Sequence, residues 1–105
     1  MSLALLYVTV KDRQEAIVLA RTLLAEKLIA CANIIPDVVS VYKWEGRVEE
    51  NSEVLLLAKI PSRRQTAVIK RVAELHSYEC PCITVVPIGS AHPPFKEWIF
   101  SITGD

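Results

Sequence analysis

The sequence has no net charge, few glycines and few histidines, and each shortage excludes a class of function. Twelve lysines and arginines balance twelve aspartates and glutamates, so no overall field attracts nucleic acid or an anionic membrane surface. The chain contains no P-loop, dinucleotide-binding fingerprint, nucleophile elbow or zinc-protease motif. No nucleophile, base and orienting group occur together, so we expect a protein that is not an enzyme and needs no organic cofactor.

Long apolar runs and paired cysteines are also missing. No apolar stretch approaches the roughly 20 residues of a membrane-spanning helix, and the first residues lack a charged segment followed by a cleavage site. Three cysteines are an odd number, without the spacing of a disulfide framework. We therefore expect no membrane association, free thiols and a cytoplasmic location.

What the sequence does contain is an apolar fraction of 51% over 105 residues, enough for one core and part of a subunit interface. The hydrophobic pattern predicts a strand at 3–10, a helix capped by Asp12 and Glu15, and strands within 29–60. A second helix is expected from a Ser62–Gln65 capping box to about 76. A buried strand at 82–88 and a last helix that begins at Pro93 and Pro94 should follow. This βαββαβ order with a C-terminal helix predicts a single α+β domain over residues 1–105. Its expected form is a ferredoxin-like sandwich with an antiparallel sheet.

The two strands between 29 and 60 form a long hairpin that turns at Glu45–Gly46. Each arm of about 14 residues would extend on the order of 45 Å, whereas a compact domain of this length is about 33 Å across. The tip should therefore protrude with its apolar side chains, and a neighbouring subunit is expected to cover them. Pro36 marks a bulge or an edge strand; the alternative is a hairpin that breaks at Pro36 and folds back on its own sheet.

The segment HSYECPC, residues 76–82, places His76, Cys80 and Cys82 close together. Thiols and imidazole are ligands for zinc or copper, but two cysteines separated by one residue are a weak metal motif. The alternative is that Cys31, Cys80 and Cys82 are small apolar residues in strands, and that His76 interacts with free carbonyls at a helix end. Glu53 and Lys59 are charges on one face of an otherwise apolar strand, and if buried they must be paired or hydrogen-bonded.

The chain resembles the CutA divalent-ion tolerance family over nearly its whole length. The residues that carry the resemblance are Leu28, Ala30, Cys31, Asn33, Pro36, Ser40, Tyr42, Trp44, Gly46, Glu53, Lys59, His76, Tyr78, Pro81 and Trp98. The resemblance implies a ferredoxin-like fold, a homotrimer in which long hairpins extend each neighbour's sheet, and an architecture similar to the PII signalling trimers. It also implies a role in copper tolerance, with Cys31 at the family's usual cysteine position.

Three positions depart from the family pattern. Cys80 and Cys82 stand where thiols are not usual, so no function carries over to them. Phe95 stands where a tyrosine precedes the tryptophan, which puts in doubt any site that relied on that hydroxyl.

Two functions follow from the sequence and the resemblance together. The first is a homotrimeric tolerance protein that binds copper, zinc or a similar divalent ion through Cys31, His76, Cys80 and Cys82. The second is a PII-like signalling or scaffolding trimer that binds a small molecule or a partner protein in clefts between subunits. The expected cleft residues are Tyr42, Trp44, Glu53, Lys59, Tyr78, Glu79 and Trp98.

Overall fold

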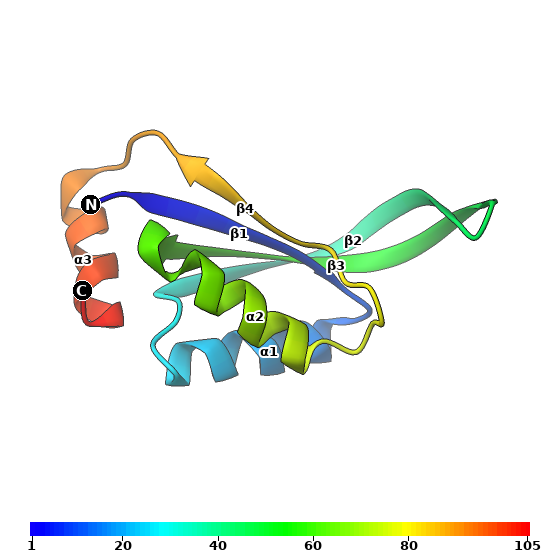
Figure 1. Cartoon of the computed structure of the whole chain (residues 1–105), viewed down its shortest axis with the longest axis horizontal. Coiled ribbons are helices and arrows are strands. Elements are labelled where there is room, and N and C mark those ends of the chain that lie inside the picture. The colour runs from blue at the N-terminus through cyan, green and yellow to red at the C-terminus, as the bar shows by residue number, and fades with distance from the viewer.

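The computed structural model describes residues Met1–Asp105 and has the α+β architecture predicted from the sequence (Figure 1). In chain order the elements are β1 (Leu3–Val10), α1 (Arg13–Ala25), β2 (Cys31–Trp44), β3 (Arg47–Pro61), the short 3-10 helix η1 (Ser62–Arg64), α2 (Gln65–Leu75), β4 (Ile83–Ile88) and α3 (Pro93–Thr103). The strands form one antiparallel sheet in the order β2-β3-β1-β4, which is the ferredoxin-like arrangement. None of the helices has the length and apolar character required to cross a membrane.

The hydrophobic core lies between one face of the sheet and helices α1 and α2 (Figure 1). Successive strand residues point to opposite faces, so every second side chain of β1 and of residues 54–60 in β3 enters this core. The fully buried members include Leu6, Val8, Leu56, Ile60, Leu23, Val68 and Val72. Burial of one such side chain contributes about 1.5–3 kcal/mol, and the core therefore holds the helices on this face.

The opposite face of the sheet carries no helix except at one end, where α3 packs Ile99 against Leu3 (Figure 1). Ile35 on β2 and Val86 on β4 are exposed there, and Leu57 on β3 is half-buried. The prediction of a buried strand at 82–88 is therefore wrong in part, because β4 begins at Ile83 and its residues Thr84, Val86 and Pro87 are exposed. An uncovered apolar sheet face of this kind is typical of a protein–protein contact surface.

The hairpin extends well beyond the rest of the sheet (Figure 1). Its strands have 14 and 15 residues and turn at Glu45–Gly46, where φ is 50° and 79°. Strand β1 ends opposite Val54, so residues 38–44 and 47–53 continue as a two-stranded ribbon. The longest dimension of the molecule is 45 Å, against 26 and 23 Å for the others. The protruding hairpin is confirmed, and the alternative in which it folds back on its own sheet is wrong.

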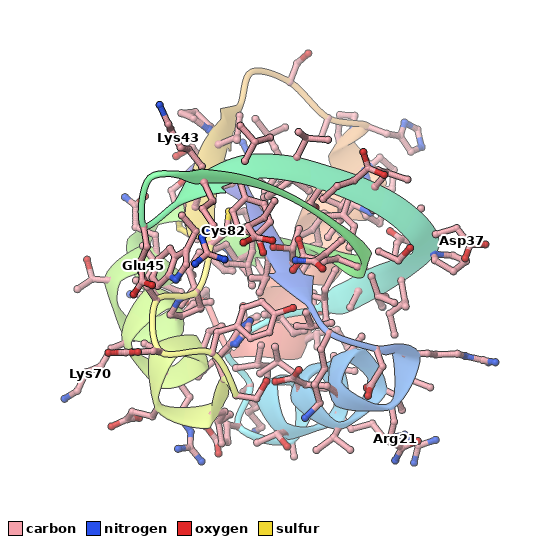
Figure 2. The ribbon with its side chains drawn as sticks, turned by 90° about the vertical axis from the view of Figure 1, so that its right-hand side faces the viewer. Arg21, Asp37, Lys43, Glu45, Lys70 and Cys82 are labelled. Atoms are coloured by element: carbon pink, nitrogen blue, oxygen red, sulfur yellow. The ribbon has the colours of Figure 1, made fainter.

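Pro36 lies at a bulge in β2, as expected. The pairing of β2 with β3 shifts between Ile35 and Val38, and Asp37 adopts a positive φ of 61°. A bulge increases the local twist and re-aims the side chains that follow it. Figure 2 shows the result, because the hairpin curves across the end of the molecule from Asp37 on one side to Glu45 on the other.

The two predicted helix starts have different outcomes. The backbone N–H of Glu15 donates to Asp12 Oδ1 at 2.8 Å, so the first cap is confirmed. The second capping box is wrong, because Ser62 lies in η1 and α2 begins at Gln65 without a side-chain cap. Ser62 is instead bound to Ser2, whose hydroxyl donates to the Ser62 hydroxyl at 2.8 Å. A contact with a residue sixty positions away in the sequence has replaced the local one.

Candidate functional site

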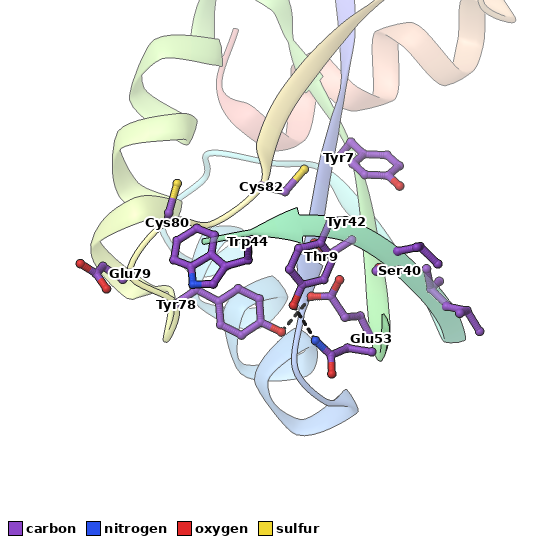
Figure 3. A pocket seen from close by; sticks show the side chains of 14 residues that line it. Tyr7, Thr9, Ser40, Tyr42, Trp44, Glu53, Tyr78, Glu79, Cys80 and Cys82 are labelled. Atoms are coloured by element: carbon purple, nitrogen blue, oxygen red, sulfur yellow. Dashed lines mark hydrogen bonds between the residues drawn. The ribbon is translucent and has the colours of Figure 1, made fainter. Parts of the chain in front are cut away.

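An open cavity of about 700 Å³ lies at the base of the hairpin, on the sheet face that carries no helix (Figure 3). Its walls come from β1, from the hairpin strands β2 and β3, and from the segment that joins α2 to β4. Of the seven predicted cleft residues, five line this cavity: Tyr42, Trp44, Glu53, Tyr78 and Glu79. Five of the seven predicted residues therefore lie around one cavity within a single chain.

The register of the hairpin explains why these side chains meet. After the bulge Val38 pairs with Glu53, and Ser40 pairs with Asn51, so Asn51 and Glu53 share one face of β3. The twisted strand β2 lines the cavity continuously from Val38 to Tyr42. Asn51 Nδ2 donates to the hydroxyl of Tyr42 at 2.5 Å, which fixes that ring against its own strand pair. The bulge at Pro36 is the sequence feature that sets this alignment.

Glu53 forms the floor of the cavity and is 9% exposed. The Tyr78 hydroxyl donates to its Oε2 at 2.8 Å, whereas Oε1 accepts no hydrogen bond from the chain. Burial raises the pKa of Tyr78, and the hydrogen bond to Glu53 and the charge of that carboxylate raise this pKa further. Tyr78 therefore stays a protonated phenol at neutral pH and remains a donor to Glu53.

His76 holds the joining segment to β1, and its side chain is fully buried. Its Nδ1 accepts from the backbone N–H of Tyr78 at 3.1 Å, so Nε2 carries the proton and donates to the Thr9 carbonyl at 2.8 Å. Both ring nitrogens are occupied, and His76 is not available to a metal ion in this arrangement. The predicted ligand is thus a residue that positions Tyr78. The alternative, in which His76 binds a free carbonyl at the helix end, names the right kind of partner. The carbonyl belongs to Thr9 of β1, however, and not to the helix.

Glu15 on α1 fixes the same segment from the other side. Its carboxylate accepts from the backbone N–H of Ser77 at 2.9 Å and from the Ser77 hydroxyl at 3.0 Å. Partial burial acts to raise the pKa of Glu15, but the hydrogen bonds from Ser77 and from the backbone of Lys11 together lower it. The start of the joining segment is therefore anchored by an ionised carboxylate at neutral pH.

The thiols do not form one site within the chain. Cys80 and Cys82 are free, exposed and line the cavity, so for these two the alternative of buried apolar residues in strands is wrong. Cys31 begins β2 at one edge of the sheet, and Cys82 directly precedes β4 at the other. Three strand spacings, about 14 Å, separate those strands. No three side chains among histidine, cysteine, aspartate and glutamate come together in a metal-binding group, so the predicted four-residue set is not assembled in a single chain.

Lys59 and Trp98 do not line the cavity. Lys59 shares the face of Glu53 but lies six residues further along β3, about 20 Å away, and its Nζ donates to Asn33 Oδ1 at 2.6 Å. Trp98 lies on α3 and stacks on Phe95 with the ring centroids 5.8 Å apart. Helix α3 and the hairpin are at opposite ends of the molecule (Figure 1), so the prediction that these two residues share a site with the other five is not supported within one chain.

Three lining residues on the central strands were not predicted. Tyr7 and Thr9 of β1 and Asn51 of β3 reach the cavity because β1 lies next to β3 in the sheet. The alternation of apolar residues in β1 indicated which of its side chains share a face of the sheet. Only the strand order, with β1 beside β3, places those side chains next to Glu53. The strand order is a property of the whole fold and has no local signal in the sequence.

The chain is similar to proteins of one family. A sequence model of the family described as CutA1 divalent ion tolerance protein matches residues 4–101. The Protein CutA homolog of Xenopus laevis is 39% identical over 96% of this chain and 67% of its own length. The divalent-cation tolerance protein CutA of Thermus thermophilus is 36% identical over 92% of this chain and 94% of its own.

Solved structures agree with the sequence comparisons. The crystal structure of CutA from Xylella fastidiosa superposes with a TM-score of 0.94 at 31% identity, over 98% of this chain and 99% of that one. The mouse and human proteins named Protein CutA are longer, and the chain spans 58% and 57% of their lengths.

Proposed function

The chain belongs to the CutA1 divalent ion tolerance family, and from this premise we propose that it is a homotrimer that binds copper or a similar divalent ion and takes part in the response to metal ions. The single observation that carries this proposal is the pair of free, exposed thiols, Cys80 and Cys82, on the wall of one cavity. Thiolates are soft donors that favour copper(I) and zinc. The family name fits a tolerance protein without catalytic activity.

The donor set favours copper over zinc as the metal. Cys80 and Cys82 lie on either side of Pro81, and two thiolates can hold a copper(I) ion without further protein ligands. A structural zinc site takes four ligands in a tetrahedron, and one chain supplies only these two thiols with Glu79 beside them. Zinc would need donors from a neighbouring chain or from solvent. When bound, the metal would be held by thiolates, and its affinity would fall at low pH because the thiols must lose their protons.

Two features favour self-association, and we place a neighbouring chain at the open side of the cavity. The hairpin exposes Val41 and Val48, which are 62% and 73% exposed, on strands with free backbone edges beyond Val54. The sheet face without helices adds a second apolar area. A PII-like ring of three chains would cover both, because each hairpin would lie against the next sheet. Three free cysteines fit a reducing cytoplasm.

A titration of the reduced protein with copper(I) and with zinc tests the metal proposal. We expect saturable copper binding that is lost in the Cys80→Ser/Cys82→Ser variant and kept in the matched control Cys31→Ser, which removes a thiol from the far edge of the sheet. Sedimentation at micromolar concentration should give the trimer mass. Copper binding that survives the double substitution would refute the assignment to this thiol pair, and a monomer would refute the assembly.

A second function is favoured by a separate observation, the convergence of five predicted cleft residues on one cavity. Aromatic rings around a few polar groups are typical of a small-molecule site. In this alternative the trimer is a PII-like signalling or scaffolding protein, and its clefts bind a small molecule or a partner protein. Binding of an organic ligand to the metal-free protein, unaffected by Cys80→Ser/Cys82→Ser, would distinguish it from the metal function.

A further inference from the structure

The charges around the cavity have one sign. Glu53 and Glu79 line it, and its 14 lining residues include no lysine, arginine or histidine. The carboxylate of Glu53 is nearly buried and forms no ion pair with any side chain of the protein. A buried carboxylate without a cation is costly unless hydrogen bonds or an incoming positive charge compensate it.

Glu53 is already oriented to receive a cation. The Tyr78 hydroxyl holds Oε2 at 2.8 Å, and this bond, together with the position of Glu53 in β3, fixes the direction of the carboxylate. The second oxygen, Oε1, has no partner in the chain and faces the cavity that Glu53 lines (Figure 3). One hydrogen-bond donor with a positive charge would satisfy both its acceptor capacity and its charge.

Aromatic rings surround this carboxylate. Tyr7, Tyr42, Trp44 and Tyr78 all line the cavity, and Tyr42 and Trp44 remain 41% and 46% exposed. The face of an aromatic ring attracts a cation, most strongly when the ring is that of tryptophan. A carboxylate at the floor and aromatic rings on the walls are the two components that recognise organic ammonium groups.

We propose that the cavity binds an organic cation, with its ammonium group at Glu53 Oε1 and its apolar or aromatic body against Trp44 and Tyr42. This inference rests on the second function above, and it names the class of ligand. A hydrated divalent metal ion fits the same place poorly, because hard cations take six or more oxygen ligands and valines and aromatic rings form much of the lining. A volume of about 700 Å³ accommodates a small organic molecule with room for a neighbouring chain to close the open side.

Calorimetric titration of the reduced, metal-free protein with three matched probes tests the proposal. The probes are phenethylammonium, its neutral isostere phenethyl alcohol, and the anion phenylpropionate. Wild-type protein should bind the ammonium at least about tenfold more tightly than the alcohol, and should reject the anion. Glu53→Gln should weaken ammonium binding by about tenfold to 100-fold and leave alcohol binding unchanged.

The control variants separate this site from the thiols and from general charge effects. Glu97→Gln removes the same charge from α3 at the other end of the molecule and should change the affinity by less than about twofold, because salt screens distant charges. Cys80→Ser/Cys82→Ser should bind the ammonium as the wild type does. If Glu53→Gln fails to fold, Trp44→Leu serves instead, with an expected loss of about fivefold or more.

Each outcome decides between the proposals. Equal affinity for the ammonium and the alcohol would overturn the organic cation while leaving a small-molecule cleft in place. No saturable binding of any probe at millimolar concentration would overturn both. If Glu53→Gln dissociates the trimer and the wild type binds no probe, the cavity belongs to a neighbouring chain, and the inference is wrong.

Discussion

Removal of one hydroxyl, in the variant Tyr78→Phe, should destabilise the protein measurably. The substitution leaves Glu53 Oε2 without its donor in a side chain that is 9% exposed. Hydrogen bonds to charged groups contribute about 1.5–3 kcal/mol, and the open cavity lets water replace part of the lost bond, so we expect about 1.5 kcal/mol. For a domain of this size, that loss of stability corresponds to a fall in Tm of about 6–12 °C. The Tm should be measured by circular dichroism at one fixed protein concentration, because the Tm of an oligomer depends on protein concentration.

A matched control lies in the same cavity. The hydroxyl of Tyr7 makes no hydrogen bond within the protein, so Tyr7→Phe should change Tm by no more than about 2–4 °C. In a cycle with Glu53→Gln, the effect of Tyr78→Phe should shrink, because the uncharged amide binds the phenol less strongly. Equal Tm values for Tyr78→Phe and Tyr7→Phe would refute the structural role of this hydrogen bond.

The raised pKa of Tyr78 adds a dependence on pH. Because the folded state holds the phenol protonated, its contribution is complete below the ordinary tyrosine pKa of about 10. It is lost as the pH rises towards the higher pKa of the folded state. The wild type should therefore lose stability more steeply than Tyr78→Phe above about pH 10, and parallel curves would contradict the assignment.

Two further predictions concern the elements that frame the cavity. Glu15→Gln should lower the free energy of unfolding at pH 7 by about 1–2 kcal/mol, because Ser77 loses a charged acceptor. Since the pKa of Glu15 is lowered in the folded state, the difference measured in urea titrations should begin to shrink below about pH 4.3 and disappear as the pH falls through the lower pKa of the folded state. A constant difference down to acidic pH would contradict the role of the charge. Gly46→Val, at a φ of 79°, should cost about 1–2 kcal/mol, whereas Gly89→Ala, which meets no atom within 4 Å, should change the stability by less than about 0.5 kcal/mol.

The sequence predicted those parts of the fold that have local causes. The alternation in β1 and β3, the cap at Asp12 and the glycine at the hairpin turn each act within a few residues. The protrusion of the hairpin followed from length alone. The cap at Ser62 failed because Ser2, sixty residues away along the chain, competes for the same hydroxyl, and no local pattern contains that contact.

The candidate site was predictable to the extent that its residues share a strand face. Glu53 was recognised as a charge that needs a partner, and Tyr78 supplies that partner. The same reasoning could not exclude Lys59, which shares the face of Glu53 but not its position along β3. It also could not identify His76 as a positioning residue, because its hydrogen bond to the Thr9 carbonyl depends on where β1 ends.

A crystal structure of the copper-loaded protein would show directly whether the thiol pair binds the metal. We predict three chains around one axis, with an anomalous copper signal between Cys80 and Cys82 in a cavity that a neighbouring chain closes. A copper signal at Cys31, or no ordered copper with both thiols reduced, would contradict the assigned site. Chains that leave the hairpin and the uncovered sheet face in solvent would contradict the assembly on which that site depends.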